Sequence, residues 1–122
     1  MYCRGIRGAT TVEYNDREEI LRGTRELLQL LAGVNNLRTE DITSAIFTVT
    51  ADLDAEFPAL AARALGWTEV ALICTREIPV PNSLPKCIRV LLHVNTTRSA
   101  AEMRHVYTRG AIALRPEFGI AP

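Results

Sequence analysis

Arginine side chains inside apolar runs are the feature of this sequence best suited to chemistry. Arg7 lies between Gly5 and Gly8, and Arg89 lies within a second apolar run. Glycine leaves room for a ligand to approach the backbone, and a guanidinium offers a carboxylate a forked pair of donors. Glu77 follows another apolar run. Two interpretations stay open: a structural ion pair between Glu77 and Arg89, or a small polar pocket for a dianionic ligand that also carries a hydroxyl.

Hydrophobic periodicity predicts the elements that position these residues. Two-residue alternation of β-branched residues predicts strands, and apolar spacing of three and four predicts helices. The longest helix pattern has Asn15 as its cap and Glu18 at the capping-box position, and Ser99 with Glu102 forms a second capping box. The expected order is strand 3–12, helix 16–34, strand 42–50, a short helix within 52–66, strand 70–75, strand 87–94, helix 99–109, strand 111–114 and a tail over 115–122.

This order predicts the fold class. A short proline-containing loop joins the third and fourth strands, so we expect them to pair antiparallel, with Glu77 and Arg89 facing each other across the sheet. The result is an α/β, or α+β-like, mixed sheet in a single-domain layer fold with helices on one sheet face. One domain accounts for the 122 residues. The uncovered face needs a partner, which a homo-oligomer built face to face would supply.

Composition and charge exclude several classes of protein. The 48% of hydrophobic residues argues against disorder. Fourteen basic and fourteen acidic residues cancel, which argues against a nucleic-acid partner. Thirteen of the basic residues are arginine, which reflects either genome composition or selection for carboxylate recognition. No run resembles a signal peptide or a membrane span, so we expect a cytoplasmic protein with no membrane partner.

Cysteines and histidines give no sign of a metal site. Cys3, Cys74 and Cys87 lack the paired spacing of a zinc site or a disulfide framework, and His93 and His105 stand alone. Cys74 and Cys87 lie in apolar runs, where an inert buried thiol is the first expectation. The common motifs for a nucleophile or a phosphate loop are also missing from the sequence. Local spacing therefore predicts no metal-ligand cluster.

The motifs taken together resemble the small trimeric chorismate mutases of the AroH class. The resemblance opens with Arg4–Thr11 and covers nearly the whole chain, in order and with similar spacing. It continues in Asp52-Leu53, Phe57-Pro58-Ala59, Arg63, Cys74, Glu77, 86–90, 104–107 and 114–116. It implies a monofunctional enzyme that converts chorismate to prephenate, the branch step toward phenylalanine and tyrosine, by a Claisen rearrangement without metal or cofactor.

The resemblance also implies roles for individual residues. Arg89 matches the family's cation at the ether oxygen of the substrate, Arg7 matches the arginine that grips a carboxylate, and Glu77 matches the glutamate that meets the ring hydroxyl. These three are the expected catalytic residues. Cys74 matches a cysteine near that hydroxyl, which replaces the expectation of an inert thiol, and Tyr107 matches a tyrosine that bonds a carboxylate.

The remaining matches concern assembly. The family joins three subunits around a threefold axis into a pseudo-α/β-barrel, with active sites between neighbours. The expected substrate-binding positions are Phe57, Ala59 and Arg63 from a neighbouring subunit, the wall residues Leu72 and Ile73, and Leu114 and Arg115 at the start of a mobile tail. Two positions depart from the pattern: Leu60 stands where some members carry lysine, and Ile73 stands where threonine can occur.

Two other classes of protein remain open at this stage. One is a trimer of the reactive-imine deaminase type, which also holds a carboxylate with an arginine at a subunit cleft. The other is a regulatory module that binds a carboxylate metabolite without chemistry. The pairing of Glu77 with both Arg7 and Arg89 favours the mutase, because a single carboxylate would not require two strand arginines.

Overall fold

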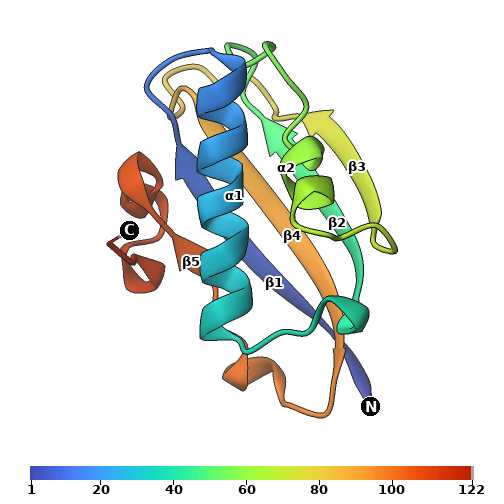
Figure 1. Ribbon diagram of the computed structural model, residues 1–122. Helices are drawn as coiled ribbons and strands as arrows, with labels where there is room; N and C mark the ends of the chain where they lie inside the picture. Colours follow the sequence, from blue (N-terminus) through green and yellow to red (C-terminus); the bar gives the residue numbers. More distant parts are fainter. Residues whose placement is uncertain (122) are drawn as a thin grey trace.

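The computed structural model describes residues 1–121 and contains one five-stranded mixed sheet with both helices on the same face (Figure 1). The strand order is β3-β2-β4-β1-β5. β4 is antiparallel to β1 and β2, while β3 runs parallel to β2 and β5 runs parallel to β1. The elements are β1 (Tyr2–Thr11), α1 (Arg17–Val34), β2 (Ile42–Val49), α2 (Ala59–Ala64), β3 (Ala71–Arg76), β4 (Cys87–Thr96) and β5 (Val106–Tyr107). The expected mixed sheet with helices is therefore confirmed.

The main core lies between α1, α2 and the helix-covered face of the sheet. Every second residue of a strand points into this layer, which is why the apolar alternation predicted the strands. Gly8 allows α1 to come close, because a Cβ there would lie 2.8 Å from Leu31 Cδ1. Fully buried members of this core include Ile6, Leu27, Leu28, Leu31, Ala45, Phe47, Leu92 and Val94.

The cap of α1 differs from the expected one by a single residue. Asp16, and not Asn15, accepts a hydrogen bond from the Glu19 backbone N–H. Asn15 Oδ1 instead accepts from the backbone N–H groups of Asp54 and Ala55, each at 3.0 Å. The Asn15 side chain therefore holds the loop before α2, and its neighbour takes over the cap.

The predicted antiparallel pairing of β3 with β4 is wrong. β2 lies between them, with Thr48 opposite Arg89 on one side and Thr75 on the other. The loop from Glu77 to Lys86 crosses the end of β2 and does not form a hairpin. A proline-containing loop of this length has enough reach for either path, so its length alone could not decide the strand order.

The predicted helix over 99–109 and the predicted strand over 111–114 are also wrong. The capping box at Ser99 and Glu102 forms, but only one 3₁₀ turn follows it, because residues 106 and 107 extend to pair with β1 as β5. Residues Arg109–Leu114 then form a 3₁₀ helix. Pairing with the edge of β1, which buries Val106 and Tyr107, outweighs the local preference of this segment for a helix.

The chain returns after this 3₁₀ helix to lie against β5. The Ile120 backbone N–H donates to the Tyr107 carbonyl at 2.9 Å, and Gly119 forms an isolated bridge with Tyr107. The C-terminal turns consequently stand beside β5 at the edge of the sheet (Figure 1). Pro122 lies outside the described residues, and the mobility of the tail stays a prediction.

The second face of the sheet carries no helix. Its exposed or half-exposed side chains include Arg7, Ile46, Ile73, Arg89, Leu91 and His93. We call this the open face. Within the described residues, no helix combines the length and apolar character that a membrane crossing requires.

Candidate active site on the open face

Four of the predicted site residues meet in one cavity on the open face. Arg7, Glu77, Arg89 and Tyr107 line a hollow of about 240 Å³ that spans β1, β2, β4 and β5. Its other lining residues are Gly8, Ile46, Thr48, Val90 and Leu91. We call this hollow the open-face pocket.

The sheet register explains why these residues converge. Arg89 pairs with Ala9 of β1 on one side and with Thr48 of β2 on the other. Arg7 is two residues before Ala9, so both point to the same face of β1. Tyr107 is opposite Ala9 in the parallel pair of β1 and β5. Positions far apart in sequence therefore form neighbouring rows on one face.

Arg89 and Glu77 are close without forming a hydrogen bond. Arg89 Nε lies 3.5 Å from Glu77 Oε2, within range of charge attraction. That Nε is shielded from solvent and has no hydrogen-bond partner within residues 1–121. A buried N–H donor without an acceptor is unfavourable, whereas the Arg89 side chain as a whole is 41% exposed and keeps surface that a ligand can reach. The two side chains therefore form the ion pair, but one that leaves Arg89 Nε without a hydrogen bond in the described chain.

Thr48 holds the Glu77 carboxylate in place. The Thr48 hydroxyl donates to Glu77 Oε2 at 2.7 Å. The Glu77 backbone N–H donates to the Val49 carbonyl, which extends the ladder between β2 and β3 by one residue. Both contacts aim the carboxylate at the pocket.

Cys87 stays neutral beside Arg89. Burial raises the pKa of the Cys87 thiol, and the charge of Arg89 and a hydrogen bond to it offset that rise only in part. The thiol is therefore protonated near neutral pH and does not cancel the guanidinium charge. The pocket keeps two arginines against one carboxylate.

His105 supports the backbone of Arg7. The Arg7 backbone N–H donates to His105 Nδ1 at 2.9 Å. Burial lowers the pKa of His105, and the charges of Arg7 and Arg115 lower it further. The neutral imidazole is therefore the form that accepts this hydrogen bond, a pairing that the sequence did not reveal.

The C-terminal segment brings two further predicted residues to the rim of this region. Leu114 packs against the small buried cluster that contains Tyr107. Arg115 pairs with Glu117 and lies over the Phe118 ring, 4.6 Å from its centroid. The Phe118 ring centroid is 6.0 Å from that of Tyr107. The segment thus covers Tyr107, although neither Leu114 nor Arg115 lines the open-face pocket itself.

The remaining predicted residues lie elsewhere in this single chain. Phe57 and Cys74 line a separate cavity of about 320 Å³ beside α2, and Phe57 is 66% exposed. Ala59 is buried at the start of α2. Burial raises the pKa of the Cys74 thiol, which a hydrogen bond from the Ala59 backbone and the charge of Arg63 partly offset.

The two wall residues of β3 point in opposite directions. Leu72 packs against the main core, while Ile73 lies on the open face and is 61% exposed. Adjacent strand residues must alternate in this way. Only Ile73 is therefore placed beside the open-face pocket, and neither lines it.

Sequence reasoning missed the pocket side chains that share the open face with Arg89. Ile46, Thr48 and Leu91 line the open-face pocket and were not singled out. The two-residue period of β2 and β4 could have found them, because they share the face of Arg89. In residues 1–121, no three His, Cys, Asp or Glu side chains gather as metal ligands would.

Comparison with known proteins identifies the family. Residues 3–118 match the model for chorismate mutase type I. The chain is 50% identical over 115 residues to "Chorismate mutase AroH" of Thermus thermophilus, covering 93% of this chain and 94% of that protein. It is 43% identical over 121 residues to "Chorismate mutase AroH" of Bacillus subtilis, covering 98% and 95%.

A solved structure agrees in both sequence and shape. The chorismate mutase from Clostridium thermocellum superposes with a TM-score of 0.88 at 55% identity. The match covers 89% of this chain and 97% of that one. The shared sheet, the arginine-rich pocket and the match over residues 3–118 lead to one conclusion: the chain belongs to the chorismate mutase type I family.

Proposed function

We propose that the open-face pocket is where this enzyme rearranges chorismate to prephenate. The observation that carries the proposal is Arg89, whose shielded Nε has no hydrogen-bond partner in the described chain although Glu77 lies 3.5 Å away. An isomerase of the chorismate mutase family acts on a substrate with two carboxylates, a ring hydroxyl and an ether oxygen. The pocket offers two guanidinium groups, a tyrosine and one carboxylate to these groups.

The chemistry of the reaction suits such a pocket. In the Claisen rearrangement one C–O bond breaks as one C–C bond forms, within a single molecule. Negative charge grows on the ether oxygen and positive charge grows on the ring fragment. The protein must hold the compact conformer of the substrate and present fixed charges that match this polarisation. Neither task requires a nucleophile or a proton transfer.

Arg89 is the group that stabilises the ether oxygen. A forked guanidinium donates two hydrogen bonds in fixed directions, and the developing oxyanion accepts them more strongly than the neutral ether does. Glu77 receives the ring hydroxyl and lies beside the electron-poor ring. The Thr48 hydroxyl keeps that carboxylate oriented while it does so.

Arg7 and Tyr107 hold the substrate carboxylates. Within residues 1–121 no hydrogen bond or ion pair engages the Arg7 guanidinium, so it is available to a ligand. Its backbone is fixed by β4 and by His105. Tyr107 is 3% exposed, which limits the movement of its ring and fixes the direction of its hydroxyl.

A homotrimer completes the site. The open-face pocket is shallow for a ligand that the enzyme must enclose, and the apolar side chains beside it, Ile46, Ile73 and Leu91, need a partner. A neighbouring subunit that docks on this face supplies the second half, with Phe57, Ala59 and Arg63 as the expected positions; Leu72 and Ile73 are the expected wall residues, and Cys74 the cysteine near the ring hydroxyl. The segment from Leu114 and Arg115 onward acts as the cover.

The proposal is tested by following the loss of chorismate absorbance in ultraviolet light with purified protein. Conversion to prephenate at the same rate with and without a chelator is expected, together with a particle mass three times the 13.5 kDa chain by light scattering. Saturable binding of chorismate without conversion would favour the binding module. Absence of both conversion and binding would overturn the assignment of the pocket.

A further inference from the structure

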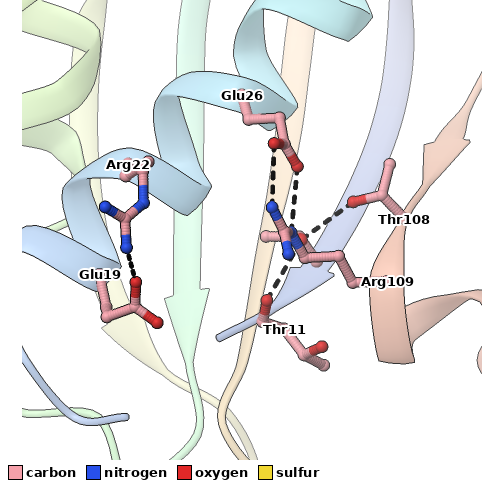
Figure 2. Close-up of polar contacts among 7 residues, drawn as sticks. Thr11, Glu19, Arg22, Glu26, Thr108 and Arg109 are labelled. Carbon is pink, nitrogen blue, oxygen red and sulfur yellow. Dashed lines mark hydrogen bonds and ion pairs between the residues drawn. The ribbon is translucent and has the colours of Figure 1, made fainter. Parts of the chain in front are cut away.

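The turn that follows β5 is tied to two other elements by side-chain contacts. The Thr108 hydroxyl donates to the Thr10 hydroxyl at 2.9 Å in a buried position. The Gly110 backbone N–H donates to Thr11 Oγ1 at 2.9 Å. Figure 2 shows that Arg109 reaches in the opposite direction, toward Glu26 on α1. The turn is thus fixed to β1 and α1 at once.

The contact between Arg109 and Glu26 is bidentate. Arg109 Nε donates to Glu26 Oε1 at 3.1 Å, and Nη2 donates to Oε2 at 3.0 Å. Two parallel bonds fix both the distance and the angle between the groups. This pair joins residues 83 positions apart, whereas Arg38 and Asp41, three positions apart, form a local pair. A long-range pair restrains the fold in a way that a local pair does not.

The backbone of the turn needs this restraint. Arg109 has φ +53°, in the left-handed region that a residue with a Cβ adopts rarely. At Gly110 a Cβ would lie 2.8 Å from Thr11 Oγ1, so the chain there is packed closely against β1. A polar cavity of about 430 Å³ borders the turn, lined in part by Thr11, Arg22 and Arg109. Open space beside a strained turn would let it move if its contacts were removed.

The turn controls the position of residues at the site. Tyr107 stands directly before it, and the segment after it returns to Tyr107 through the Ile120 backbone N–H. Phe118 of the same segment packs on both His105 and Tyr107. A change in the path of the turn therefore shifts Tyr107, Arg115 and Phe118 together.

We propose that Arg109 and Glu26 are a pair of positioning residues that set the C-terminal segment over the substrate site. Neither residue lines the open-face pocket, so they act through Tyr107 and the segment that covers it. This inference rests on the proposed function of that pocket. The pair stabilises the closed arrangement of the segment and thereby favours substrate capture.

The test compares Arg109→Ala with Arg38→Ala, which removes a similar exposed ion pair far from the turn. We expect kcat/KM of Arg109→Ala to fall by about three- to tenfold, mainly through KM, because capture weakens while Arg89 is intact. Arg38→Ala is expected to keep the wild-type values. The charge-reversed double variant, Glu26→Arg with Arg109→Glu, should recover most of the loss.

Hydrogen exchange supplies a readout that is independent of turnover. Amides of residues 113–121 should exchange faster in Arg109→Ala than in Arg38→Ala, with the α1 amides unchanged. Equal exchange in the two variants would overturn the inference whether or not the protein turns over chorismate. Equal kinetics in an active enzyme would also overturn it and leave the proposed function standing. An inactive wild-type protein with faster exchange in Arg109→Ala would contradict the proposed function alone.

Discussion

The two faces of the sheet are built from the same strands, but one packs against the helices and the other stays partly exposed. On β4, Ile88, Val90, Leu92 and Val94 point to the helix-covered face and are at most 3% exposed. Their sequence neighbours Arg89, Leu91 and His93 point the other way and remain partly exposed. A period of two residues separates the side chains that stabilise the fold from those on the face where we propose that the ligand binds.

This division shows how the enzyme tolerates an unfavourable arrangement. A shielded guanidinium donor without a hydrogen-bond partner reduces stability, and Arg89 carries such a donor at the open-face pocket. The main core lies on the opposite face of the sheet. Changes on the two faces should therefore have separable effects on stability and on turnover.

The largest effect on stability is expected on the helix-covered face. Phe47 is completely buried, so Phe47→Ala should lower the free energy of unfolding by about 3–5 kcal/mol through lost burial and the remaining cavity. Urea unfolding followed by circular dichroism measures this change. A loss below about 1 kcal/mol would mean that this face is not the principal core.

The geometry of the cation should matter as much as its charge. Arg89→Lys retains a positive charge but replaces the fork with a single ammonium group, so we expect turnover to fall by roughly tenfold to a hundredfold. The rate of chorismate loss at saturating substrate measures it. Unchanged turnover would show that a point charge is sufficient at this position.

A smaller effect is expected from the neighbour of Phe47 on the open face. Thr48→Val keeps the shape of the side chain but removes the hydroxyl that orients Glu77. We expect kcat/KM to fall by about three- to tenfold, since one neutral-to-charged hydrogen bond is lost. The unfolding midpoint should change far less than it does for Phe47→Ala. A shift as large as that of Phe47→Ala would remove the distinction between the faces.

The smallest effect concerns pH. Burial, Arg7 and Arg115 together lower the pKa of His105 from 6.5, while Glu117 is the carboxylate of the neighbouring C-terminal segment. The unfolded chain therefore takes up this proton more readily, and stability is lost as pH falls from 6.5 through the lowered pKa.

The matched variant is His105→Asn, which keeps an acceptor for the Arg7 backbone N–H but cannot titrate. Its melting temperature should depend less on pH than that of the wild type between about pH 7.5 and pH 5. Parallel curves for the two proteins would show that His105 does not contribute to the acid sensitivity.

The sequence predicted the strands well because each strand has a buried face. The alternation in β1, β2 and β4 and the apolar run of β3 are direct consequences of burial. Strand order was not predicted, because it depends on which edges meet in space and the loop from Glu77 to Lys86 allows more than one path. The helix expected over 99–109 failed for a similar reason, since an edge of β1 recruited Val106 and Tyr107.

Four of the twelve predicted site residues meet within a single chain. Arg7, Glu77, Arg89 and Tyr107 converge in the structure because the sheet register aligns them. β2 lies between the strands of Glu77 and Arg89, and the Thr48 hydroxyl on β2 orients the Glu77 carboxylate. The sequence did not show either of these two features. Phe57 and Cys74 line another cavity of this chain and do not reach the open-face pocket.

The most direct test of the account is the turnover of chorismate by Arg89→Ala, measured with its melting temperature. The account predicts a loss of roughly 10²–10³-fold in kcat, with a melting temperature close to that of the wild type. This combination would place the catalytic charge on the open face and the stability on the other. Near-normal turnover by a folded Arg89→Ala protein would contradict the central claim.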